Sequence, residues 1–230
     1  MSADDPHHDA RPGHDLPDDR GRTGLHRTGR GLTGNPDVRI NDVEVVSDGW
    51  YVLRRTTFDY RGRDGEWTTH ARETYDRGNG ATVLLYDPVG RTLLLSRQFR
   101  LPAYVNGHPD GMLVEAAAGL LDGDAPEEAI RREAAEELGV QVGALDHLFD
   151  LFMSPGSVTE CVHFYAAEYL PTEIAGGGGL AEEGEEIEPV TVGYDEALAM
   201  IADGRIVDGK TVILLQWAAL NLFGQDHHRS

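Results

Sequence analysis

The sequence predicts a mixed α/β or α+β domain, because short apolar strands surround a central charged helix and two further helical segments follow them. The clearest strands are ATVLLYD (81–87) and RTLLLSRQF (91–99), two apolar runs separated by Pro88, Val89 and Gly90. Apolar residues recur at helical spacing up to Leu138, and again in YDEALAMIADG and GKTVILLQWAALNLF. These elements predict a single domain in which a sheet packs against helices.

The N-terminal part of the chain divides into two segments. Residues 1–37 are poor in large apolar side chains and rich in Gly, Arg, Asp, His and Pro, so we expect a disordered extension. Ordered structure is expected from about Arg39, where VEVVSDGWYVLRRTTFDY shows a hairpin-like pattern and Asp64-Gly65 offers another turn. The expected boundaries are therefore an extension over 1–37, a small β subdomain over 38–80 and the main domain over 81–224.

Later segments complete the expected sheet. GMLVEAAAG is read as a short strand that leads into the charged helix, and LDHLFDLFMSPG and CVHFYAAEYL as two more strands. AGGGGLAEEGEEIE (175–188) is a low-complexity run. His108, His147 and His163 stand isolated in the sequence and are expected to be ordinary surface or core histidines.

The bulk composition excludes several classes of protein. The chain carries 20 Lys and Arg against 40 Asp and Glu, and this net charge of −20 argues against general binding to nucleic acid or anionic membranes. No apolar stretch approaches the ~20 residues that cross a bilayer, and the N-terminus lacks a signal-peptide core. The single cysteine, Cys161, rules out an intramolecular disulfide framework and fits a small buried residue. We therefore expect a soluble cytoplasmic protein.

The central helix carries two groups of glutamates. Asp124 is the expected N-cap, Glu127 completes a capping-box pattern, and Glu127 and Glu128 suit the positive end of the helix dipole. Pro126 fits the first turn, and Gly139 stands where a left-handed C-terminal cap is expected.

The second group, Glu133, Glu136 and Glu137, is harder to explain. Glu133 and Glu137 lie at i and i+4 on one side of the helix, at the edge of an apolar stripe and near the negative end of the dipole. Like charges at this spacing destabilise a helix by a few tenths of a kcal/mol, roughly 0.2–0.5 per pair. A solvated face and a site for Mg²⁺ or Mn²⁺ both account for the group, and spacing alone leaves the choice open.

The segment from Ala118 to Val140 closely resembles the Nudix box, whose core reads Arg-Glu-hydrophobic-x-Glu-Glu-x-Gly-hydrophobic. The residues that match this core are Arg132, Glu133, Ala134, Glu136, Glu137, Gly139 and Val140. Two departures are visible: Gly119 is one residue nearer the Arg-Glu pair than the general pattern, and Ala125 occupies the usual first Glu position. The shortened spacing is similar to that of the GDP-mannose pyrophosphatase group, in the nucleoside diphosphate-sugar branch of the family.

Four further stretches resemble that group, namely RETYDRGNGATVLLYD, SRQFRLPAYVNG, MSPGSVTE and IVDGKTVILL, so the likeness runs from about Asp42 to Leu220. It implies a Nudix fold, a mixed sheet sandwiched by helices and preceded by the small β subdomain. It also implies a homodimer in which the N-terminal strands contribute to the partner's pocket.

The resemblance implies a Mg²⁺ site, with Mn²⁺ as the alternative ion. Its implied ligands are Glu133, Glu137, the backbone carbonyl of Ala118, and Glu185 in the Gly/Glu loop, with Glu136 as an additional or water-mediated ligand. Arg132 would orient the carboxylates through charge-assisted hydrogen bonds. Glu185 would also deprotonate or orient the attacking water, with Glu183 as the second choice for this loop position.

Substrate contacts are implied at eight positions: Trp50, Arg72, Glu73, Arg100, Gly119, Leu120, Glu160 and Lys210. Several have a structural alternative. Trp50 could be a core or dimer-interface aromatic, Arg72 and Glu73 a surface ion pair, and Lys210 a helix-start charge. Arg100, at the mouth of an apolar strand, is favoured as a ligand of the diphosphate.

The implied activity is Mg²⁺-dependent hydrolysis of a small-molecule nucleoside diphosphate-sugar, with GDP-mannose giving GMP and mannose 1-phosphate. Three alternatives stay open: an ADP-ribose or ADP-sugar pyrophosphatase, a non-catalytic Nudix domain that senses nucleotide sugars, and a non-enzymatic acidic scaffold.

Overall fold

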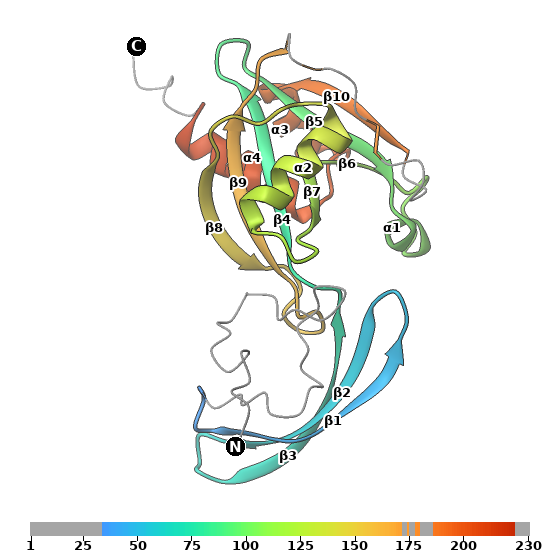
Figure 1. The fold of residues 1–230 in the computed structure, drawn as a ribbon, viewed down its shortest axis with the longest axis vertical. Coiled ribbons are helices and arrows are strands. Elements are labelled where there is room, and N and C mark those ends of the chain that lie inside the picture. The colour runs from blue at the N-terminus through green and yellow to red at the C-terminus, as the bar shows by residue number, and fades with distance from the viewer. Residues whose placement is uncertain (1–33, 172–173, 175–177, 180–185, 224–230) are drawn as a thin grey trace, which may run out of the picture. The chain divides into compact units, whose positions relative to one another are not determined.

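The computed structural model describes residues 34–171, 174, 178–179 and 186–223 (Figure 1). Most of the expected extension over 1–37, and the loop acids Glu183 and Glu185, lie outside these residues. The chain forms two compact units. The first joins the described residues up to Asn79 with Phe152–Val162, and the second joins Gly80–Leu151 with the described residues from His163 onward.

The first unit is built on an antiparallel three-stranded sheet in the order β1-β2-β3. Its strands are β1 (Val38–Asp48), β2 (Val52–Arg61) and β3 (Trp67–Asp76). The turn expected at Asp64-Gly65 joins β2 to β3, and Gly65 adopts a φ of 85° that favours glycine. The first strand thus begins at Val38, next to Arg39, from which ordered structure was expected.

The second unit contains a seven-stranded sheet, counted over the described residues. Its main order is β10-β5-β4-β9-β8, with β6 paired to β5 and β7 paired to β4. The strands are β4 (Gly80–Asp87), β5 (Thr92–Phe99), β6 (Met112–Glu115), β7 (Ala117–Leu120), β8 (Asp146–Phe152), β9 (Cys161–Glu168) and β10 (Ile187–Gly193).

Strands β4 and β5 pair with each other only near their connecting turn, from Leu85 opposite Leu94 to Asp87 opposite Thr92. Beyond that point they take different partners: β7 pairs with the first half of β4, and β6 pairs with the second half of β5. The stretch 111–119, expected as one strand, is therefore two strands divided at Ala116. This division brings the ends of β5, β6 and β7 to one part of the sheet.

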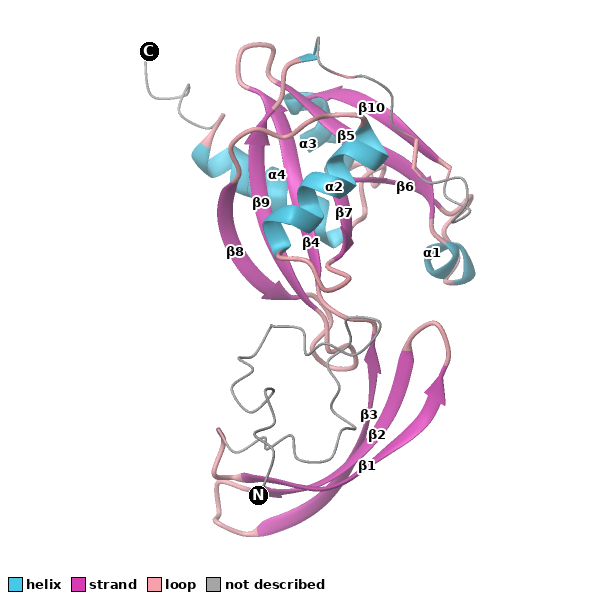
Figure 2. Cartoon of the chain, viewed as in Figure 1, coloured by secondary structure: helices cyan, strands magenta, loops and turns pink. Residues whose placement is uncertain are grey.

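Helices cover both faces of this sheet (Figure 1). Helix α2 (Pro126–Leu138) lies on one face, over a core that includes Val83, Leu94 and Tyr165. Helices α3 (Tyr194–Ala202) and α4 (Gly209–Asn221) lie on the other face, and both were expected (Figure 2). The predicted mixed sheet sandwiched by helices is confirmed.

Two elements were not expected. Helix α1 (Leu101–Val105) is a single short turn that begins just after Arg100. Strand β10 pairs along β5 and follows the low-complexity run, although it contains Pro189. Among the helices of the described residues, none has the length and apolar character that crossing a bilayer requires.

Candidate active site

Helix α2 begins one residue later than expected. Its N-cap is Ala125 rather than Asp124, and no side chain caps the first turn, so the capping-box prediction is wrong. The Asp124 carboxylate lies instead 3.6 Å from Nε of Arg132. Glu127 and Glu128 occupy the exposed first turn as expected, and Gly139 ends the helix with a left-handed φ of 68°.

The second group of glutamates on α2 is not a solvated face. Glu137 is only 3% exposed, and the Glu133 side chain is 15% exposed. Both lie beside the fully buried stripe of Ile130, Ala134 and Leu138. An ionised carboxylate is costly to bury without compensating charge, and a divalent cation is one group that can supply that charge.

Arg132 holds this group together. Its Nη1 lies 2.8 Å from Oε1 of Glu133 and 3.6 Å from Oε2 of Glu136, and its Nη2 donates to the carbonyl of Leu120 at 3.5 Å. Partial burial acts to lower the pKa of Arg132, but attraction to Glu133 and Glu136 outweighs it and raises that pKa. The guanidinium therefore stays charged and ties α2 to the end of β7.

Strand β7 packs directly against the Glu133 side chain at Gly119. A β-carbon built on Gly119 would lie 2.0 Å from the Glu133 carboxyl carbon and 2.2 Å from Oε1, so only glycine leaves this carboxylate where it is. Ala118 and Leu120 flank Gly119 on β7, where Ala118 pairs with Thr82 of β4. The structure thus brings Ala118, Gly119 and Leu120 to the carboxylate end of α2.

Arg100 reaches the same part of the second unit from the end of β5. Its Nε and Nη2 donate to Oε2 of the buried Glu115 at 2.9 and 2.7 Å. Burial acts to lower the pKa of Arg100, but the carboxylates of Glu115, Glu137 and Asp208 outweigh it and raise that pKa. Sequence reasoning missed Glu115, although an acid inside the apolar stretch GMLVEAAAG was a usable signal.

The start of α4 completes this charged group. Asp208 caps α4 by accepting from the Thr211 amide at 2.9 Å, and its other oxygen lies 2.7 Å from Nζ of Lys210. Thr211 also bonds the Ala116 amide at 2.7 Å, which ties the helix start to the β6–β7 junction. Lys210 thus lies at the helix start with its ammonium group paired to Asp208, and a substrate contact at this position stays a prediction. Asp208 is a second residue that sequence reasoning missed.

A cavity of about 880 Å³ adjoins Arg100. Strands β5, β6 and β10 line it, together with Glu186, which precedes β10. Arg97 and Arg100 contribute two guanidinium groups to its wall, and Arg97 pairs with Glu188 at 3.2 Å. Its size falls within the range of small-molecule sites, about 300–1,000 Å³.

Four of the expected substrate contacts belong to the first unit. Trp50 is 81% exposed, so it is not a core aromatic of the described chain. Glu73 pairs with Arg55 on the neighbouring strand at 3.2 Å, rather than with Arg72 beside it, and both partners are half-exposed. Glu160 lies 3.4 Å from Nε of Arg77.

Two other expectations concern single residues. Cys161 is buried as a free thiol, as predicted. His147 and His163 are not isolated in space, because both contact Asp150.

Comparison with known proteins explains the acidic helix. The family model described as NUDIX domain matches residues 76–215, and the one described as GDP-mannose pyrophosphatase NudK N-terminal domain matches residues 37–75. The chain belongs to the Nudix family. The prediction of a Nudix hydrolase is thereby confirmed.

Curated relatives that match most of this chain support its membership of the Nudix family. A GDP-mannose pyrophosphatase of Yersinia enterocolitica is 52% identical over 80% of this chain and 97% of its own length. Another, of Klebsiella pneumoniae, is 52% identical over 79% of this chain and 91% of its own. A solved structure described as an ADP compounds hydrolase covers 83% of this chain and 96% of its own, with a TM-score of 0.62. At 22% identity, that structure supports the fold alone.

The Nudix helix has a donor set that suits a hard divalent cation. Glu133, Glu136 and Glu137 offer only oxygen atoms, the ligands that Mg²⁺ prefers. The missing side chain at Gly119 leaves room for the Glu133 carboxylate on the β7 side. The residues present therefore fit the divalent metal that Nudix hydrolases use.

Proposed function

We propose that this Nudix hydrolase cleaves the diphosphate bond of GDP-mannose to give GMP and mannose 1-phosphate. The observation that carries the proposal is the 52% identity to a GDP-mannose pyrophosphatase across 97% of that relative's length. The cavity beside Arg100 and the acids of α2 support the proposal, because they offer a space and metal ligands for a substrate that carries two phosphates.

The proposed metal ligands are Glu133, Glu137 and the carbonyl of Ala118, with Glu136 in addition. When bound, Mg²⁺ would supply neutralisation of the diphosphate and a water of lowered pKa. Arg132 holds the Glu133 carboxylate in place through its 2.8 Å contact. The loop ligand and base, Glu185, lies outside the described residues and is proposed from the resemblance alone.

Arg100 is the proposed phosphate-binding residue of the second unit. Glu115 accepts from Nε and Nη2, which fixes the plane of the guanidinium, and the Nη1 group is the one proposed to face an anion. A fixed, charged donor costs little to reorganise when the substrate binds. Gly119, Leu120 and Lys210 are the other proposed contacts in this unit; Trp50, Arg72, Glu73 and Glu160 are those of the first.

The domain boundaries expected from sequence, with a β subdomain over 38–80, are part of the proposal, as is a homodimer. The first unit exposes several large apolar side chains, including Ile40, Val45, Val46 and Trp50. Exposed apolar groups on a small sheet favour packing against another surface. We expect a dimer by light scattering, and Val46→Asp should shift it toward monomer.

A cytoplasmic location is also part of the proposal. The single cysteine and the net charge of −20 fit a cytoplasmic protein.

A substrate panel tests the activity. The purified chain with Mg²⁺ is assayed on GDP-mannose, ADP-ribose and ADP-glucose, and the products are identified by mass. Preferred release of GMP and mannose 1-phosphate supports the proposal, whereas preference for ADP-ribose would replace it with the ADP-sugar alternative. Binding without turnover would indicate a sensor.

A pair of variants on α2 tests the site. Glu137→Gln removes a buried charge at the proposed metal and should lower kcat by about 100-fold or more. Glu128→Gln removes an exposed charge from the first turn of the same helix and should leave kcat unchanged. Equal activity of the two variants would refute the site assignment.

A further inference from the structure

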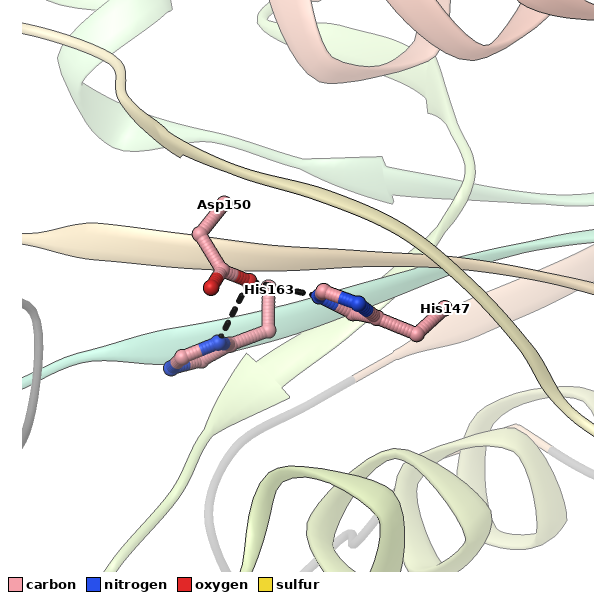
Figure 3. A group of neighbouring side chains, drawn as sticks. All are labelled: His147, Asp150 and His163. Carbon is pink, nitrogen blue, oxygen red and sulfur yellow. Dashed lines mark hydrogen bonds and ion pairs between the residues drawn. The ribbon is translucent and has the colours of Figure 1, made fainter.

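A cluster of two histidines and an aspartate lies on β8 and β9, outside the proposed active site (Figure 3). Nε2 of His147 lies 2.7 Å from Oδ1 of Asp150, and Nδ1 of His163 lies 2.8 Å from the same oxygen. One nitrogen of each ring and one carboxylate oxygen all lie within 4.8 Å of one another. Three potential metal ligands thus already converge.

Packing orients the rings of this cluster. His163 is a buried residue of β9, the strand next to β8 in the sheet. It lies on the same face of β9 as Tyr165, which follows two residues later. The His147 ring packs against Tyr165 with 5.3 Å between ring centroids. His147 and Asp150 are about half exposed, so an ion could reach them from solvent. One ligand is therefore fixed by burial, and two are accessible.

Asp150 is the acceptor that the two rings share. Its Oδ1 contacts both imidazoles, and an aspartate carboxylate is ionised at neutral pH. In the absence of a metal, both rings must donate N–H groups to this one oxygen, and a cation could replace both protons.

The donor chemistry differs from that of α2. Two imidazole nitrogens and one carboxylate oxygen form a borderline-soft set, which favours Zn²⁺ over Mg²⁺. Tetrahedral bonds of about 2.0–2.1 Å need ligand atoms about 3.3–3.4 Å apart, so the two N···O separations would open by roughly 0.6 Å. Rotation of the half-exposed His147 and Asp150 side chains would supply this change. Three protein ligands would leave the fourth position to water.

We propose that His147, Asp150 and His163 form a second metal site, which takes Zn²⁺ or a similar borderline transition ion. The bound ion would cross-link the end strand β8 to its neighbour β9 and so stabilise the second unit. This site is independent of the Mg²⁺-dependent hydrolysis assigned to α2, because none of its ligands belongs to that group.

The test uses the full chain with competing histidines removed. The background variant replaces six histidines outside the described residues with Asn: His7, His8, His14, His26, His227 and His228. Zn²⁺ is titrated by calorimetry in saturating Mg²⁺, which occupies the acids of α2. We expect one Zn²⁺ per chain and a rise in Tm on its addition.

Single substitutions in this background then locate the ion. His147→Asn and Asp150→Asn alter half-exposed positions and should each weaken Zn²⁺ binding by about 10-fold or more, since loss of a merely supporting residue already costs about 10- to 100-fold. The matched control is His108→Asn, which alters a histidine that also contacts an aspartate, Asp110, and should leave binding unchanged. Absence of 1:1 binding in the background, or equal affinity in His147→Asn, would overturn the proposal.

Discussion

Gly119 on β7 lies directly against the carboxylate of Glu133 on α2. A β-carbon at Gly119 would meet the Glu133 carboxyl group at 2.0–2.2 Å, well inside any van der Waals contact. The group in its way is the end of a flexible side chain rather than backbone. A larger residue at 119 would therefore displace the carboxylate more readily than it would unfold the protein.

Gly119→Ala should separate activity from stability for this reason. We expect kcat with Mg²⁺ to fall by about 10- to 100-fold, as for other changes that misplace a metal ligand. The free energy of unfolding should change by less than about 1 kcal/mol, because Glu133 can rotate aside. Steady-state kinetics and urea unfolding measure the two quantities.

Gly143→Ala is the matched control, because a β-carbon at Gly143 meets nothing within 4 Å. It should leave both kcat and stability unchanged. If Gly119→Ala kept full activity, or unfolded the chain, the proposed role of the contact would be wrong.

Glu115→Gln should loosen Arg100 while keeping the shape of the side chain. The variant replaces the carboxylate acceptor of two hydrogen bonds with a neutral amide oxygen, a loss of about 1.5–3 kcal/mol in orientation of the guanidinium. We expect kcat/KM for the diphosphate substrate to fall by about 10- to 100-fold.

The control for Glu115→Gln is Asp195→Asn, which removes the acid of an exposed Arg91–Asp195 pair at 3.5 Å. Its kcat/KM should match that of the wild type. Equal kcat/KM in Glu115→Gln would mean that Arg100 does not depend on Glu115 for its position.

The acidic helix was predictable because its signals are local. Three and four residue spacings place Glu133, Glu136 and Glu137 together on any helix, and Gly139 marks its end. The prediction of Asp124 as N-cap failed because Asp124 pairs with Arg132 instead, a contact between the helix and the turn before it. The spacing of residues does not show whether the Asp124 carboxylate caps the helix or pairs with Arg132.

Contacts between distant segments were not predictable from pattern alone. Arg100 and Glu115 meet only because β6 pairs with the second half of β5, and Asp208 joins them from the start of α4. Likewise, His147 and His163 looked isolated because the pairing of β8 with β9 was not known. Helix α1, with five residues, is too short to show a helical period in the sequence. Strand β10 was missed because it contains Pro189, a residue that argues against a strand.

Asp208→Asn should lower stability in a pH-dependent way. Burial acts to raise the pKa of Asp208, but Lys210 and the bonds from Thr211 outweigh it and hold that pKa below its usual value. A carboxyl group whose pKa is lowered by folding stabilises the fold above its unfolded pKa, about 3.9, and loses this contribution as pH falls through the folded value. Asn keeps the helix cap but not the charge.

The expected loss for Asp208→Asn is about 1–2 kcal/mol at pH 7, and it should shrink as the pH falls below about 4. Urea unfolding at pH 7, 5 and 3 measures it. A deficit that stayed constant down to pH 3 would show that the charge of Asp208 does not contribute.

Asp76→Asn should destabilise the first unit far more than a comparable surface change. Arg54 and Asp76 form an ion pair with both side chains fully buried, and the other Asp76 oxygen accepts from Thr159 at 3.1 Å. Removing one charge leaves Arg54 buried without its counter-ion, at a cost of about 3–5 kcal/mol. Glu73→Gln breaks the half-exposed pair with Arg55 on the same sheet and should cost at most about 1 kcal/mol. Hydrogen exchange at β2 amides reports this unit directly, and equal protection in both variants would mean that burial adds nothing to the Arg54–Asp76 pair.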